Sequence, residues 1–154
     1  SVTDLVLDIK ASNINEDGFQ DLLVLYTRTD YFGWYIQVLI NNLDGTFRDE
    51  SLERLPQSGE SEPWLSEVQF IDFDKDGDLD IAAFPSVGNK NAHFFRNNGD
   101  GTYKNIGNPF NFEAEFFTFL DINQDGYLDV LWAENYPSYA FYLNRSLGCP
   151  ALEK

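Results

Sequence analysis

The sequence predicts an all-β protein made of three consecutive repeats, each a four-stranded antiparallel sheet. Two observations predict this fold: an acidic motif occurs three times, and short apolar runs of strand length flank every copy. The chain has 154 residues, of which 43% are hydrophobic and 16% aromatic, so it is able to bury a core.

The acidic motif has the pattern D/N-x-D/N-x-D-G-x-x-D followed by an apolar residue. Its copies are "NINEDGFQDL" from Asn13, "DFDKDGDLDI" from Asp72 and "DINQDGYLDV" from Asp121, with glycines 59 and 49 residues apart. A second motif follows as "INNLDGTF" and "RNNGDGTY", and only its first Asn, Asn144, is left in the third copy. We therefore place one domain over residues 1–154, with repeats at about 1–58, 59–109 and 110–154.

The strands follow from the apolar runs in chain order. We expect them over 4–11, 21–26, 35–40 and 46–50, then 67–72, 79–84, 92–97 and 102–106, then 115–121, 128–134 and 139–144. The run 79–84 is almost wholly apolar, which suits a strand buried on both faces. The Asp-Gly pairs predict tight hairpin turns, and the fourth strand of the third repeat is missing or weak. No helix is expected, and residues 52–63, with their Pro, Gly and Ser, are predicted to be a linker.

The acidic loops predict cation sites. Calcium takes six to eight oxygen ligands, and positions 1, 3, 5 and 9 of the motif supply side-chain oxygens. Glycine at position 6 permits the sharp turn, and position 7 lends its carbonyl, so that its side chain is free to vary. The predicted ligands are Asn13, Asn15, Asp17, Phe19 and Asp21; Asp72, Asp74, Asp76, Asp78 and Asp80; and Asp121, Asn123, Asp125, Tyr127 and Asp129. Up to three Ca²⁺ ions are expected, one per repeat, with the four-carboxylate middle loop tightest and the first loop weakest.

Three other interpretations of the loops compete with this calcium site. An EF-hand requires a bidentate Glu at position 12 between helices, whereas this chain has Val24, Ala83 and Trp132 there, in predicted strands. Magnesium fits less well, because it rarely uses a cage made only of protein ligands. Asp and Asn acting simply as turn residues remain the alternative.

The acidic motif followed by N-N-G-D-G-T-F resembles the FG-GAP/VCBS-type repeats, and the resemblance covers nearly the whole chain. These repeats form calcium-binding blades in integrin α-subunit heads and in many bacterial secreted proteins. The resemblance implies β-propeller blades, often seven to a ring, with calcium in the hairpin between the first two strands. Three blades cannot close a ring, so either further blades or self-association is implied.

Composition and motifs limit the function. The net charge is −16 with 10 Lys and Arg, which disfavours nucleic acid and anionic membranes, and no apolar run is long enough for a membrane span. Neither His93, the single histidine, nor any other residue forms an evident catalytic constellation, so we do not expect an enzyme.

We expect a non-catalytic recognition or adhesion module, secreted or on a cell surface, with a protein or glycan ligand. The alternatives are a lectin-like carbohydrate-binding domain, an accessory domain of a secreted polysaccharide-acting enzyme, and a structural element of a larger complex. Aromatic side chains in the loop between the second and third strands are candidate ligand contacts, or they pack between blades: Tyr31, Trp34, Tyr35, Tyr136 and Tyr139.

Overall fold

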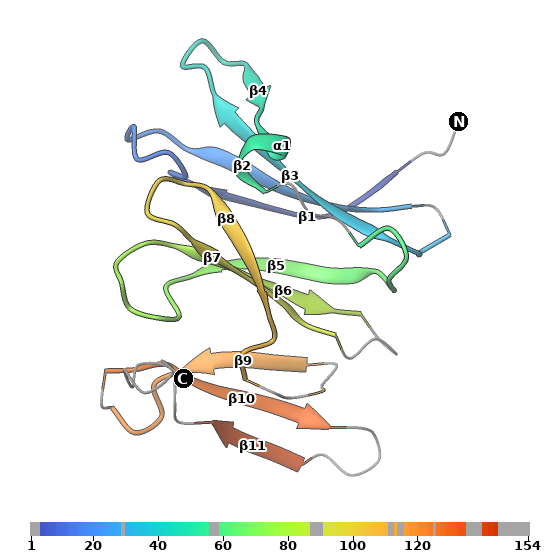
Figure 1. Cartoon of the computed structure of the whole chain (residues 1–154), viewed down its shortest axis with the longest axis vertical. Helices are drawn as coiled ribbons and strands as arrows, with labels where there is room; N and C mark the ends of the chain where they lie inside the picture. Colours follow the sequence, from blue (N-terminus) through green and yellow to red (C-terminus); the bar gives the residue numbers. More distant parts are fainter. Residues whose placement is uncertain are drawn as a thin grey trace.

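The fold consists of three antiparallel sheets, stacked in chain order along the long axis (Figure 1). A computed structural model describes residues 4–28, 30–55, 59–86, 91–110, 113, 116–124, 126–134 and 140–144. The predicted Tyr136, Tyr139 and Asp125 lie outside these residues. The expectation of an all-β fold with antiparallel sheets is confirmed.

Each sheet is a meander of strands that are consecutive in the chain. The first has the order β1 (Leu5–Ser12), β2 (Asp21–Thr27), β3 (Trp34–Asn41) and β4 (Phe47–Asp49). The second has the order β5 (Leu65–Ile71), β6 (Asp80–Pro85), β7 (His93–Asn97) and β8 (Tyr103–Gly107). The third contains β9 (Phe116–Leu120), β10 (Asp129–Glu134) and β11 (Ala140–Asn144), with β10 in the middle. Every predicted strand is present, and no end is displaced by more than two residues.

One prediction about the connections is wrong. Residues 52–63 were expected to be a linker without a helix, but a single helical turn, α1 (Ser51–Arg54), follows β4. The turn is held by Arg54, whose Nε donates to Glu50 at 2.7 Å and whose Nη1 donates to the carbonyl of Gly101 at 3.0 Å. This connection fixes the end of the first sheet to the β7–β8 turn of the second.

Two apolar layers hold the stack together. Leu23, Leu25 and Val38 of the first sheet pack with Val68, Ile81 and Phe95 of the second. On the other side of the second sheet, Ala82, Phe84 and Phe94 pack with Phe117 and Val130 of the third, where the rings of Phe84 and Phe117 stack with centroids 4.0 Å apart. Strand β6 is buried along its whole length, as its apolar sequence predicted, because it contributes to both layers.

A polar cluster closes one end of the layer between the first and second sheets. The indole N–H of Trp34 donates to Glu62 Oε2 at 3.0 Å, and Nε2 of His93 lies 2.9 Å from the same oxygen. The His93 ring also packs against Trp34, with ring centroids 4.8 Å apart. Burial lowers the pKa of His93, although the nearby Glu62 carboxylate acts in the opposite direction.

No helix in the described part of the chain is long and apolar enough to cross a membrane.

The lowered pKa of His93 predicts a pH-dependent stability. Because the folded pKa lies below the unfolded value of 6.5, the unfolded chain takes up the proton first, and the contribution of His93 is lost as the pH falls below that value. Between pH 7 and pH 5, the free energy of unfolding of the wild type should fall more steeply than that of His93→Gln. Urea unfolding of both proteins across this range measures the difference. Parallel pH profiles would contradict the prediction.

Candidate metal centre

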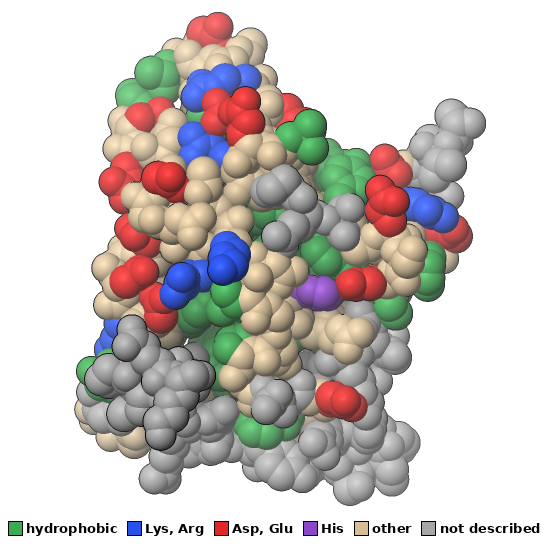
Figure 2. All heavy atoms as spheres, in the orientation of Figure 1, with side chains coloured by type: hydrophobic (Ala, Val, Ile, Leu, Met, Phe, Trp, Pro, Cys, Tyr) green, Lys and Arg blue, Asp and Glu red, His purple; other side chains and the backbone are tan. Residues whose placement is uncertain are grey.

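The three acidic loops occupy the same place in each sheet, between its first and second strands. They comprise residues 13–20, 72–79 and 121–128, and all three lie on one side of the stack (Figure 1). Asp and Glu side chains gather along this side of the first two sheets (Figure 2). The strand–loop–strand setting agrees with the prediction and leaves no place for an EF-hand.

The loops also share one backbone course. Position 6 has positive φ in each copy, at 91° in Gly18, 100° in Gly77 and 86° in Gly126. Position 4 has positive φ as well, in Glu16, Lys75 and Gln124, between 58° and 62°. The glycines were predicted from the motif, whereas the left-handed residue at position 4 was not, because its side-chain type differs in every copy.

The aspartate at position 9 is buried in all three copies and bonds to the backbone. Its Oδ2 accepts the N–H of position 2, from Ile14 to Asp21 at 2.9 Å, from Phe73 to Asp80 at 3.2 Å and from Ile122 to Asp129 at 3.1 Å. The loop is therefore held closed by a side chain at its own end. A buried carboxylate is tolerated only with such partners.

The same aspartates reach the next hairpin of the sheet. Oδ1 of Asp21 accepts the N–H of Asn41, and Oδ1 of Asp80 accepts the N–H of Asn97, both at 2.8 Å. These two asparagines begin the Asn-Asn-x-Asp-Gly turns, and their Nδ2 groups donate back to the carbonyls of Gln20 and Leu79 at 3.1 Å. The two motifs are thus parts of one hydrogen-bonded unit, which explains their fixed order in the sequence.

The third sheet departs from this arrangement. Its register places Asn144 opposite Val130, whereas Phe95, two residues before Asn97, is opposite the corresponding Ile81. Asn144 therefore occupies the position of Leu39 and Phe95, which is two residues before the position of Asn41 and Asn97. It is not the positional equivalent that the sequence motif predicted.

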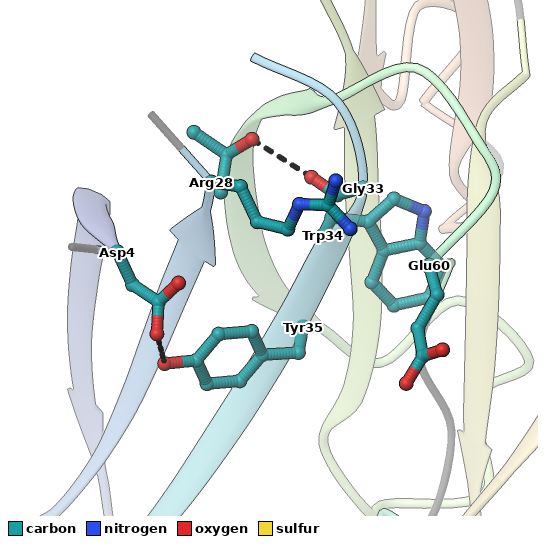
Figure 3. Close-up of a pocket in the computed structure, with 7 residues that line it drawn as sticks. Asp4, Arg28, Gly33, Trp34, Tyr35 and Glu60 are labelled. Atoms are coloured by element: carbon teal, nitrogen blue, oxygen red, sulfur yellow. Dashed lines mark hydrogen bonds between the residues drawn. The ribbon is translucent and has the colours of Figure 1, made fainter. Parts of the chain in front are cut away.

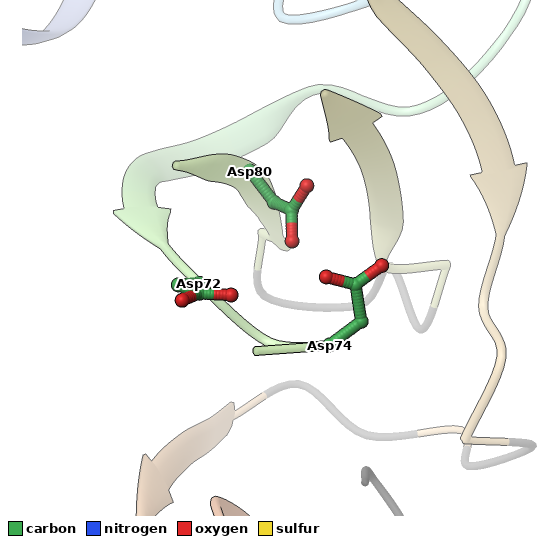
Figure 4. Close-up of side chains that lie close together, drawn as sticks. All are labelled: Asp72, Asp74 and Asp80. Carbon is green, nitrogen blue, oxygen red and sulfur yellow. The ribbon is translucent and has the colours of Figure 1, made fainter. Parts of the chain in front are cut away.

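The middle loop brings three predicted ligands together. Asp72, Asp74 and Asp80 each offer a carboxylate oxygen, and these oxygens lie within 4.8 Å of one another (Figure 4). Asp72 directly follows β5, Asp74 lies further along the loop, and Asp80 begins β6. Among the described residues, no other group of three His, Cys, Asp or Glu side chains converges in this way.

The electrostatics of this cluster are unfavourable without a counter-charge. Burial, together with the charges of Asp74 and Asp76, raises the pKa of Asp80 to about 7, against the hydrogen bonds from Asn97 and Phe73. Burial and the charge of Asp76 also raise the pKa of Asp74. A cation among these oxygens would replace the proton that the cluster otherwise favours.

Unsatisfied oxygens give an independent test of whether a cation fits. Asp72 Oδ1 in the middle loop and Asn13 Oδ1 in the first are shielded from solvent and have no hydrogen-bond partner. Both occupy position 1 of the motif. A buried acceptor without a donor is costly, and a hard divalent cation binds such oxygens. The residues at position 1 therefore fit a Ca²⁺-type ion.

The remaining predicted ligands are placed differently. Asp76 and Asp78 lie outside the converging group, with Asp76 Oδ1 accepting the Asp78 N–H at 3.0 Å. In the first loop, Asn15 donates to Asp17 at 2.9 Å, and Phe19 is exposed. In the third loop, Asp121 accepts the Gly126 N–H at 2.9 Å, Asn123 is exposed, and Lys75 lies over the ring of Tyr127 at 4.5 Å.

The predicted ligand aromatics divide between core and surface. Trp34 is 3% exposed and packs between sheets, so it follows the packing alternative. Tyr31 is half exposed, with its ring edge against Trp64. Tyr35 lines a hollow of about 320 Å³ with Asp4, Arg28 and Glu60 (Figure 3). Its ring stacks on Tyr26, with centroids 4.6 Å apart.

The fold and this site together define a repeat protein of antiparallel sheets, each with an acidic loop in its first hairpin. Residues 13–83, from the first acidic loop through most of β6, match the FG-GAP-like repeat family. This match supports an FG-GAP-type repeat protein, as the motifs suggested. A search of curated proteins and a search of solved structures each found no significant match.

The buried position-9 aspartates predict a structural role that needs no cation. In chelator, Asp21→Ala should lower the free energy of unfolding by about 2–4 kcal/mol, because the N–H groups of Ile14 and Asn41 lose their acceptor. Asp17→Ala, which removes an exposed carboxylate from the same loop, should stay close to the wild type. Urea unfolding in EGTA compares the three proteins. If Asp21 acted only as a cation ligand, both variants would unfold alike.

Proposed function

We propose that this chain is a calcium-stabilised, non-catalytic recognition module that works outside the cell, with its sheets arranged as β-propeller blades. The observation that carries the proposal is the convergence of Asp72, Asp74 and Asp80 beside the unsatisfied Asp72 Oδ1. The match of residues 13–83 to the FG-GAP-like repeats supports an adhesion-type role and an extracellular location, because such repeats are typical of extracellular proteins.

Calcium suits this site because its ligands are all oxygens and its charge is high. In the middle loop, Asp72, Asp74 and Asp80 would hold the ion, with Asp76 and the Asp78 carbonyl as further donors. In the other repeats, Asn13, Asn15, Asp17 and Asp21, and Asp121, Asn123, Asp125 and Asp129, would do so with fewer carboxylates. The ion would supply positive charge to the hairpin and so favour the folded state.

Calcium binding is tested by calorimetry and thermal melting. We expect the wild type to bind Ca²⁺ tightest in the middle loop and weakest in the first, because affinity follows ligand charge. Free calcium at about 100 times Kd should stabilise the protein by about 2.7 kcal/mol. Asp74→Asn should weaken the tightest site by about tenfold or more, since it removes one of three converging carboxylates.

The control for this variant is Glu53→Gln, which removes one charge from an exposed position on α1, away from the loops. It should bind calcium like the wild type. Melting curves that coincide in calcium and in chelator, or an unaltered tight site in Asp74→Asn, would refute the proposal.

A carbohydrate ligand is the second candidate, and the hollow beside Tyr35 favours it. Thr27 donates to the Gly33 carbonyl at 2.7 Å, and the N–H of Gly33 donates to Glu62 at 2.7 Å, so two distant segments frame a fixed cavity. Arg28 supplies donors, Asp4 and Glu60 supply acceptors, and Tyr35 supplies a ring held by Tyr26. Donors, acceptors and an aromatic ring in one hollow are what sugar hydroxyls and sugar rings require.

Saturation-transfer NMR with a panel of monosaccharides tests the carbohydrate candidate. A sugar that binds the wild type should lose at least tenfold in affinity on Tyr35→Ala, which removes the ring from the hollow. Phe47→Ala, which truncates an exposed ring on β4, should leave the signal unchanged. The carbohydrate candidate fails if no sugar gives a signal with the wild type, or if the two variants behave alike.

A further inference from the structure

Neighbouring acidic loops meet through fixed positions of the motif. Where the middle loop meets the third, which we call the second loop junction, Lys75 at position 4 of one loop reaches positions 6 and 7 of the next. Its Nζ lies 4.5 Å from the centroid of the Tyr127 ring, and a Cβ added to Gly126 would lie 3.4 Å from that Nζ. An ammonium group therefore lies between these two loops, where the face of the ring attracts it.

The first loop junction, where the first loop meets the middle loop, uses the same positions but has carboxylates in place of the ammonium. Glu16 at position 4 has a φ of 61°, against 62° for Lys75. It lines a hollow of about 180 Å³ with Gly77 and Asp78, which are positions 6 and 7. Neither carboxylate has a hydrogen bond or an ion pair within the described residues. Two negative side chains thus share the junction that holds a cation in the following pair of loops.

A buried hydroxyl also lines this hollow. Tyr103 is 5% exposed, and its hydroxyl makes no hydrogen bond within the part of the chain that the structure describes. Burial raises the pKa of this hydroxyl, and the charges of Asp80 and Asp78 act in the same direction. The charge of Arg54 opposes them, but Arg54 is itself paired with Glu50 at 2.7 Å. A buried polar group without a partner is costly, so the hollow suits a polar occupant.

A hydrated divalent cation has the charge and the size that this hollow requires. The two carboxylates repel each other unless positive charge lies between them, and water bound to a cation would give the Tyr103 hydroxyl a partner. A volume of about 180 Å³ has room for an ion with several waters of about 30 Å³ each. Magnesium keeps several of its waters and binds proteins through one or two carboxylates. We propose that the first loop junction binds a hydrated Mg²⁺-type cation between Glu16 and Asp78.

This junction site is separate from the cation sites within the loops. Glu16 is at position 4, which supplies no loop ligand, and Asp78 is at position 7, which offers its carbonyl to the loop and leaves its carboxylate free. The junction site therefore does not depend on calcium in the loops. An ion there would join the first and second repeats, as the Lys75 side chain joins the second and third.

Glu16→Lys tests the proposal, because it gives the first junction the residue that the middle loop already carries at position 4. Lys75 shows that a lysine is accommodated there with the same positive φ. Mn²⁺, which favours the same oxygen ligands as Mg²⁺, is titrated into the calcium-free whole chain, and the free ion is counted by electron paramagnetic resonance. We expect Glu16→Lys to bind one Mn²⁺ fewer than the wild type, because its ammonium takes the place of the ion.

Two further variants make this count specific. Asp78→Asn keeps the position-7 carbonyl and should lose the same ion as Glu16→Lys. Glu53→Lys makes the same change of charge at an exposed position on α1 and should bind as many ions as the wild type. If Glu16→Lys or Asp78→Asn binds as many Mn²⁺ ions as the wild type, the proposal is wrong.

Thermal melting in chelator gives a second readout. Glu16→Lys should melt at a higher temperature than Glu53→Lys, because its ammonium relieves repulsion at the junction itself, whereas the control changes only the overall charge. A melting temperature at or below that of the control would overturn the proposal. The loop sites are judged separately, by the calcium response of the wild type and Asp74→Asn. Loss of one Mn²⁺ in Glu16→Lys without any calcium response would refute the loop sites and support the junction site.

Discussion

The buried aspartate at the end of each acidic loop is the interaction on which the rest of the structure depends. Asp21 and Asp80 accept backbone N–H groups from their own loop and from the following hairpin, so one carboxylate joins three strands. A buried carboxylate is costly unless it is fully paired, and these pairs are specific in direction and distance. In the middle loop, the negative charge on this carboxylate is unfavourable, because burial and neighbouring carboxylates raise the pKa of Asp80 to about 7.

The hydrogen bonds of this aspartate show that the positions of the acidic motif are under different constraints. Position 9 is constrained by the fold, since only a short side chain with two acceptor oxygens bridges the loop and the Asn turn. Positions 1 and 3 are less constrained by the fold, and they are where Asp and Asn alternate between copies. The first loop keeps Asp21 and its backbone hydrogen bonds but has Asn13 and Asn15, so fewer carboxylates surround that aspartate. The acid at position 9 is therefore weaker support for a cation than the unsatisfied oxygens at position 1.

The sequence predicted the strands well because the apolar runs are short and end at turns with Asp, Asn and Gly. It did not predict the bond from Asn41 to Asp21, because partners 20 residues apart are defined by register and not by local pattern. The sequence also did not predict on which face of the sheet Trp34 lies, because that depends on packing against the second sheet and on Glu62. The convergence of Asp72, Asp74 and Asp80 was predicted from spacing, whereas the position of Asp76 outside that group depends on how the loop turns.

Each sheet has two unlike faces, and this asymmetry governs how the sheets combine. A face lined by Leu23 and Leu25 meets a face lined by Ile81 and Ala83, and the pattern recurs with Phe84 against Phe117. A stack built by one repeated contact must end in one face of each kind, whatever its length. The position-9 aspartates hold the strands in the register that places residues on these faces. A shift of one residue would move every side chain to the opposite face. The same carboxylates that shape the acidic loops thus also determine which surfaces the stack presents at its ends.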